Sequence, residues 1–149
     1  MRDGLSSKRI RPLIAPVAAV TDNTATVSSI IDCQGYDAVT LAYVTGTLSD
    51  ADATFTALLE ESDDSGMSGS TAVADADMVS QTNGTAPEAA GSYTFADDAE
   101  SRAIGYVGSK RYIRLTITPA NNTGNHFVAG VAILEQKAPA FGALAASQS

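Results

Sequence analysis

The sequence contains few of the residues from which catalytic and metal centres are usually built. Its 149 residues include one Cys, one His and no Trp, and only 6% of them are aromatic. Cys33 alone cannot form an intramolecular disulfide, a CxxC pair or a cysteine-based zinc site. The shortage of aromatic rings also disfavours the sugar-stacking site of a glycosidase. These absences indicate that function depends on surfaces of the fold rather than on a reactive group.

The two residues that could act as base or nucleophile have no supporting motif. His126 stands in a predicted turn before Phe127, and no GxSxG elbow supplies a serine nucleophile. Cys33 has no sequence neighbour that would activate a thiol, so we interpret it as a small core or edge residue. We therefore expect no enzymatic activity and no cofactor.

Basic residues are absent from the middle of the chain. The interval from Asp50 to Glu100 holds 12 of the 17 acids and no Lys or Arg. Met1–Pro12 has the opposite balance, with Arg2, Lys8, Arg9 and Arg11 against a single acid. The formal net charge of -8 argues against DNA or RNA as a partner, because phosphate binding requires a cationic surface.

Pairs of neighbouring acids could place oxygens around Ca²⁺, but none has the spacing of an EF-hand loop. We predict that these carboxylates are solvated in loops and bind no metal. The pairs are Asp50 with Asp52, Glu60 with Glu61, Asp63 with Asp64, Asp75 with Asp77, and Asp97 with Asp98.

Long apolar runs are also absent. Pro12 and Pro16 interrupt the N-terminal segment, and the apolar run there is too short for a membrane span or an export signal. We expect synthesis in the cytoplasm and no membrane partner.

The sequence is rich in short segments with a period of two, separated by turn residues. Thr, Ser, Val and Gly are abundant, which favours strands and turns over amphipathic helices. About eight strands follow one another without a βαβ pattern. The fold is therefore predicted to be all-β, an antiparallel β-sandwich of jelly-roll type with extended N- and C-terminal arms. An immunoglobulin-like sandwich is the alternative, weakened by the missing Cys and Trp landmarks.

The clearest strand pattern occurs in Lys110–Gln136. In its first arm, Ile113, Leu115 and Ile117 alternate with polar residues, which indicates one buried face. The second arm, Phe127–Glu135, is apolar on both faces, so we expect both faces to be covered. A polar stretch with Pro, Asn and Gly joins the arms, and the two are predicted to form a hairpin.

Other segments complete the predicted sandwich. Residues 37–46 and 53–61 both alternate, and they are predicted to pair as a second hairpin. A proline inside the candidate strand at 13–20 restricts it to an edge. Residues 62–90 are predicted to form a long loop with a short strand near 76–80.

The predicted domain organisation is a basic N-terminal arm at 1–12, a β-sandwich at 13–136 and a C-terminal arm at 137–149. Frayed termini would explain both arms, and the alternative is that the arms contact neighbouring subunits. The candidate contact residues are Arg2, Lys8, Arg9, Arg11, Phe141 and Leu144.

Five phrases in this order resemble a group of small virion proteins of tailed bacteriophages, and the resemblance covers about residues 25–136. It implies a capsid decoration, or cement, protein with a jelly-roll fold, and it carries over no catalytic residues. The phrases are IIDCQGYDAVTLAYVTG at 30–46, ATFTALLEESDD at 53–64, AVADADM at 72–78, KRYIRLTITP at 110–119 and AGVAIL at 129–134.

Such a protein would lie on the outer capsid surface of the virion and stabilise the shell by bridging capsid subunits. Its implied partners are the major capsid protein and sister copies of itself, for example as a trimer. Two alternatives remain open from the residues. A receptor-binding or glycan-binding module on the tail or head would use the loop at 62–90, and a hydrolase would need an acid pair such as Asp75 and Asp77 in a cleft.

Overall fold

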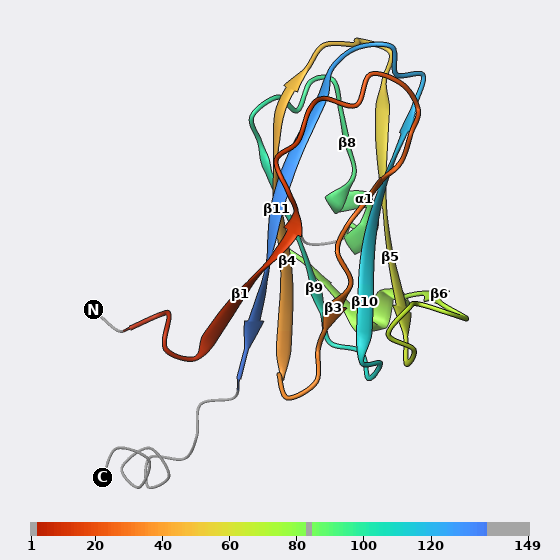
Figure 1. Ribbon diagram of the computed structural model, residues 1–149. Helices are drawn as coiled ribbons and strands as arrows, with labels where there is room; N and C mark the ends of the chain where they lie inside the picture. The colour runs from red at the N-terminus through yellow and green to blue at the C-terminus, as the bar shows by residue number, and fades with distance from the viewer. Residues whose placement is uncertain (1–2, 83–84, 137–149) are drawn as a thin grey trace, which may run out of the picture.

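The computed structural model describes residues 3–82 and 85–136 of the chain. Two antiparallel β-sheets face each other across a hydrophobic core (Figure 1). This arrangement confirms the predicted all-β, antiparallel sandwich of jelly-roll type. The described residues form 11 strands, more than the eight expected, because several loop segments add strands of two or three residues.

The first sheet, called sheet A, has five strands in the order β1-β11-β4-β9-β7. Every neighbouring pair in it is antiparallel. The long strands β11 and β4 lie side by side inside the sheet, and β1 and β7 form its edges. The strands are β1 (Lys8–Ile14), β4 (Ala38–Leu48), β7 (Met78–Ser80), β9 (Ser101–Tyr106) and β11 (His126–Glu135).

The second sheet, called sheet B, is built around the long pair formed by β10 and β5. Two short strands pair with β10 and two with β5. The strands are β2 (Thr26–Val27), β3 (Ile31–Asp32), β5 (Thr54–Ser62), β6 (Thr71–Ala72), β8 (Tyr93–Thr94) and β10 (Tyr112–Ala120).

Two short helices complete the described part of the chain. The single turn η1 (Asp75–Asp77) leads into β7, close to the short strand predicted near 76–80. Helix α1 (Pro87–Gly91) packs against β5 and β9. Neither helix has the length and apolar character needed to cross a bilayer.

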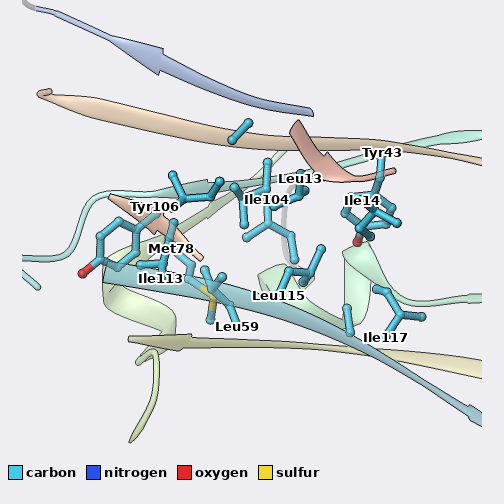
Figure 2. Packing of buried hydrophobic residues seen from close by; sticks show 14 of the residues in the cluster. Leu13, Ile14, Tyr43, Leu59, Met78, Ile104, Tyr106, Ile113, Leu115 and Ile117 are labelled. Carbon is cyan, nitrogen blue, oxygen red and sulfur yellow. The ribbon is translucent and has the colours of Figure 1, made fainter. Parts of the chain in front are cut away.

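Alternating side chains of the long strands fill the space between the sheets, as their sequence pattern predicts. Figure 2 shows Leu59, Ile113, Leu115 and Ile117 of sheet B in one buried cluster with Ile104, Tyr43 and Tyr106 of sheet A. The largest of these side chains are almost completely removed from water, which is the main favourable contribution to folding.

Both predicted hairpins are wrong. β10 pairs with β5, whereas β11 pairs with β1 and β4, so the two arms of Lys110–Gln136 lie in different sheets. The predicted partners at 37–46 and 53–61 are also separated, because β4 belongs to sheet A and β5 to sheet B. In each case the consecutive strands face each other across the core and share no hydrogen-bonded ladder.

Hydrogen bonds to distant loops hold the connection from β10 to β11, which crosses from sheet B to sheet A. The buried Asn122 donates from Nδ2 to the carbonyl of Asp22 at 3.0 Å. Thr123 donates from its backbone N and its Oγ1 to Asp50 Oδ2 at 2.7 and 2.8 Å. The turn therefore depends on partners far away in sequence, which its own residues could not indicate.

Strand β1 begins earlier than the strand predicted at 13–20. It pairs with β11 from Lys8 onward, with a register shift between Pro12 and Ile14. Pro12 lacks an N–H, but on an edge strand this removes no bond to a further strand. Residues 8–12 of the predicted arm are therefore part of sheet A.

Candidate binding surfaces

The outward-facing side of sheet A is apolar and exposed. On β11, Ala132 and Leu134 point into the core, and the alternate residues Val131 and Ile133 point outward. Val131 is 39% exposed. The prediction that both faces of β11 are covered is therefore not met within the described residues, where only the inner face is covered.

Cross-strand pairing arranges the outward residues of sheet A in rows. Each row runs across the sheet at right angles to the strands and contains both bulky and small residues. One row is Ile10, Ile133, Thr40, Gly105 and Val79; the next is Pro12, Val131, Ala42 and Ala103; a third is Ala129, Val44 and Ser101. These rows define the outer face of sheet A.

The outer face of sheet A holds almost no charge. None of the residues in the three rows is ionisable. The row beyond them carries Lys8 and Glu135, whose side chains form an ion pair of 3.1 Å. Because the chain has a net charge of -8, this face is far less acidic than the protein as a whole.

The outer face is slightly hollow over β11 and β4. A shallow depression of about 380 Å³ is lined there by small residues, among them Ala42, Ala129 and Gly130, and by the bulkier Val44 and Val131. Ile14 and Pro16, at the end of β1 and just after it, also line it. A side chain added at Gly130 would collide with the carbonyl oxygen of Ala42 at 2.7 Å, so the backbones of β11 and β4 approach closely here.

A second surface, called the basic groove, lies beside β1. It is an open groove of about 520 Å³ with Arg11 and Pro12 on one wall. The opposite wall is formed by residues 29–32 together with Gln34 and Tyr36. It runs between the edge of sheet A and the short strand β3 of sheet B.

The unneutralised charge at the basic groove is positive. Arg9 and Arg11 are exposed, and neither forms an ion pair with another described residue. The acid in the groove is Asp32, which Arg111 binds through two hydrogen bonds of 3.0 and 2.9 Å. These hydrogen bonds hold the pKa of Asp32 below its ordinary value, so the carboxylate is charged and already paired.

The predicted contact residues fall into two groups. Lys8, Arg9 and Arg11 all lie on β1, and Lys8 is paired with Glu135. Arg2, Phe141 and Leu144 lie outside the described residues. The outer face of sheet A was missed, because its rows exist only once the strand order is known. The apolar second face of β11 was the sequence signal that pointed toward it.

The histidine is closed off from solvent. His126 is the first residue of β11 and is 2% exposed, with its ring stacked 4.3 Å from that of Phe55. Its Nε2 lies 2.7 Å from the hydroxyl oxygen of Tyr93, and no described residue bonds Nδ1. Burial lowers the pKa of His126 to about 4, so the ring is neutral at pH 7.

The thiol and the acid pairs show no arrangement for chemistry among the described residues. Burial raises the pKa of Cys33 to about 12, which keeps the thiol protonated and weakly nucleophilic. Asp75 is exposed on η1, and Asp50 serves as an acceptor that joins two loops. No group of three or more metal-binding side chains occurs in this part of the chain.

No protein-family model and no curated protein matches the chain. Among solved structures, it is similar to a xylan-binding CBM22-1 domain from Paenibacillus barcinonensis, at 10% identity over 90% of this chain and 89% of that one, with a TM-score of 0.43. It is also similar to a xylan-binding module, CBM15, at 10% identity over 92% and 96%, with a TM-score of 0.38. A structure of infectious bursal disease virus, Gt strain, matches at 13% identity over 96% and 47%, with a TM-score of 0.28. Likenesses of this size assign no function to this chain.

Proposed function

We propose that this chain is a non-catalytic structural protein of a virus particle, which binds the outer surface of a tailed-bacteriophage capsid and stabilises the shell by bridging capsid subunits. The observation that carries the proposal is the pair of exposed, unneutralised arginines on β1, Arg9 and Arg11, of which Arg11 lines an open groove, on a chain with a net charge of -8. The resemblance of residues 25–136 to small virion proteins supports the same role.

The basic groove suits an acidic, partly apolar segment of a capsid protein. Two guanidinium groups can each form paired hydrogen bonds with carboxylates. Ile30, on the opposite wall, is 39% exposed and offers apolar surface to the same segment. Acidic residues on the rest of the chain repel an acidic partner. The favourable orientation is therefore the one that brings the groove toward the capsid.

The test uses particles of the virus that encodes the chain. The protein should be found in purified particles, and particles that lack it should lose resistance to heat and low salt. Purified protein should then rebind such particles. The double substitution Arg9→Glu and Arg11→Glu should weaken rebinding at least about 10-fold, because it reverses the charge of the groove.

The matched control replaces the same two residues by lysine, which keeps the charge and should retain most of the binding. Absence of the protein from purified particles would refute the virion role. Rebinding that is equal for the glutamate and lysine variants would refute the groove as the contact.

A glycan-binding module is the second candidate, and the outer face of sheet B favours it. Thr54 and Thr56 of β5 lie beside Ala120 and Thr118 of β10, so hydroxyl groups gather on one exposed surface. Hydroxyl groups of this kind can hydrogen-bond sugars. Retention on insoluble xylan or on a glycan array, lost in a Thr56→Val and Thr118→Val variant, would favour this candidate over the capsid role.

A further inference from the structure

We propose that the outer face of sheet A is the interface of a two-fold symmetric dimer, in which this face packs against the same face of a second copy. This interface is separate from the role assigned to Arg9 and Arg11, and the inference does not rest on the proposed function.

The outer face of sheet A is apolar over several neighbouring strands. Ile10 is 54% exposed, Val79 is 52% exposed and Val44 is 48% exposed, and all three lie on the same side of one sheet. Scattered apolar residues on a surface are ordinary, but a continuous apolar patch marks an interaction surface. Covering these side chains would remove their apolar area from water.

The size of the face limits how tightly it can bind. Sheet A has five strands, which at about 4.8 Å apart span about 20 Å. The three outward rows are about 7 Å apart along the strands and cover about 20 Å in that direction, so they offer about 400 Å². A stable protein interface of standard size buries about 800 Å² on each partner, so a dimer formed through this face should be weak and should dissociate on dilution.

The distribution of charge favours contact through this face. Two copies with a net charge of -8 each repel one another unless their acids stay apart. The three rows contain no ionisable residue, and Lys8 neutralises Glu135 in the row beyond them. Of the two sheet faces, this is the one that brings the fewest charges together. The outer face of sheet B carries the ion pair of Arg114 with Glu60.

The shape of the outer face is complementary to itself in a two-fold dimer. A two-fold axis parallel to the strands and between β11 and β4 places each of these strands over the other in the second copy. Val131 then lies over Ala42 of the second copy, and Val44 lies over Ala129 of the second copy. In both cases a bulky side chain meets a small one.

The same axis brings β1 over β9 of the second copy. Ile10 then lies over Gly105 of the second copy, and Pro12 lies over Ala103 of the second copy. The pairing of bulky with small residues therefore extends from the centre to the edge strand. Two sheets packed face to face lie about 10 Å apart, and their strand directions differ by about 30°. The pairing of bulky with small residues is therefore best at the central strands β11 and β4.

The first experiment measures the mass of the full chain by sedimentation over a range of concentrations. Wild type should be a dimer that dissociates on dilution. Ala42→Arg places a charge at the centre of the face and should give a monomer, with a dissociation constant raised at least about 100-fold. Thr118→Arg, on the outer face of sheet B, is the matched control and should leave the dimer unchanged. Val131→Lys serves as a second test if Ala42→Arg fails to fold.

The second experiment tests the alignment itself. Ala42→Val alone should weaken the dimer about 10-fold, because it places two valines opposite each other. Adding Val131→Ala should restore the dimer, because a bulky residue again meets a small one. A wild-type chain that is monomeric up to its solubility limit would refute the dimer, and so would a trimer, since a two-fold contact closes at two copies. Failure of the second substitution to restore association would refute the two-fold alignment.

Discussion

The stability of this protein should decrease on acidification because of a single buried imidazole. His126 is 2% exposed, and its pKa is lowered from 6.5 to about 4 by burial. Between these two pH values the unfolded chain binds a proton that the folded chain does not. The contribution of His126 is therefore complete above about pH 6.5, falls as the pH drops, and is fully lost below about pH 4.

The magnitude follows from the difference between the two pKa values. At about 1.4 kcal/mol for each unit of pKa, the free energy of unfolding should fall by about 3 kcal/mol over the whole range. About 2 kcal/mol of this loss should be present by about pH 5. Such a change is a substantial part of the stability of a typical domain.

Carboxylates contribute to acid sensitivity in a different pH range. Hydrogen bonds lower the pKa of Asp32, Asp50 and Glu60 below their ordinary values of 3.8, 3.8 and 4.5. Groups with a lowered pKa lose their contribution only as the pH falls through that lowered value. The range from about pH 6.5 down to about pH 5 therefore isolates the histidine.

The assay is urea unfolding followed by far-UV circular dichroism at a series of pH values, with wild type compared with His126→Gln. The glutamine amide keeps a hydrogen-bonding group near Tyr93 and does not titrate. Its stability should be nearly constant from about pH 7 to about pH 5, whereas that of wild type should fall by about 2 kcal/mol. Parallel curves for the two proteins would refute the reasoning. Because the chain has one His, its imidazole NMR signal is unambiguous, and a folded-state midpoint near 6.5 would refute it independently.

Three further predictions concern packing and reactivity. Leu115→Ala should cost about 3 kcal/mol in urea unfolding because it leaves a cavity at a fully buried site, whereas Leu58→Ala, at a 37% exposed site in the same sheet, should cost less than about 1 kcal/mol. Gly91→Ala should lower the free energy of unfolding by about 1–3 kcal/mol, because the added Cβ would lie 2.5 Å from the hydroxyl oxygen of Tyr43. Gly4→Ala adds a Cβ that meets no neighbour, so this control should be neutral. Cys33 should react with a disulfide reagent at least about 100-fold more slowly in the folded chain than in urea, because its pKa is raised to about 12.

Each of these predictions has a clear contrary result. Equal losses for the two leucine variants would show that β10 does not lie in the core. A neutral Gly91→Ala would mean that α1 does not lie against the Tyr43 hydroxyl and Ile104. Rapid modification of Cys33 in the folded chain would show that its thiol is accessible and ionised.

The alternation of residues determined which side of each long strand is buried, and the structure confirms it for β4, β5 and β10. In β10, Ile113, Leu115 and Ile117 all point into the core. A period of two follows from local backbone geometry, so it can be read without knowing any neighbour. Pairing partners could not be read in this way, because β10 and β11 are joined by a turn whose bonds reach Asp22 and Asp50. The consecutive strands therefore cross between sheets, although the turn residues resemble those of a hairpin.

By itself, the sequence determined an all-β sandwich with a basic segment near one end and an acidic middle, because composition, charge and periodicity are properties of the chain in any arrangement. Only the tertiary structure decided which residues share a surface. It placed Arg9 and Arg11 on an edge strand beside a groove, and it joined residues from five separate strands into one apolar face. The physical reason is that strand order and register set side-chain neighbours across a sheet, and both depend on contacts between segments far apart in sequence.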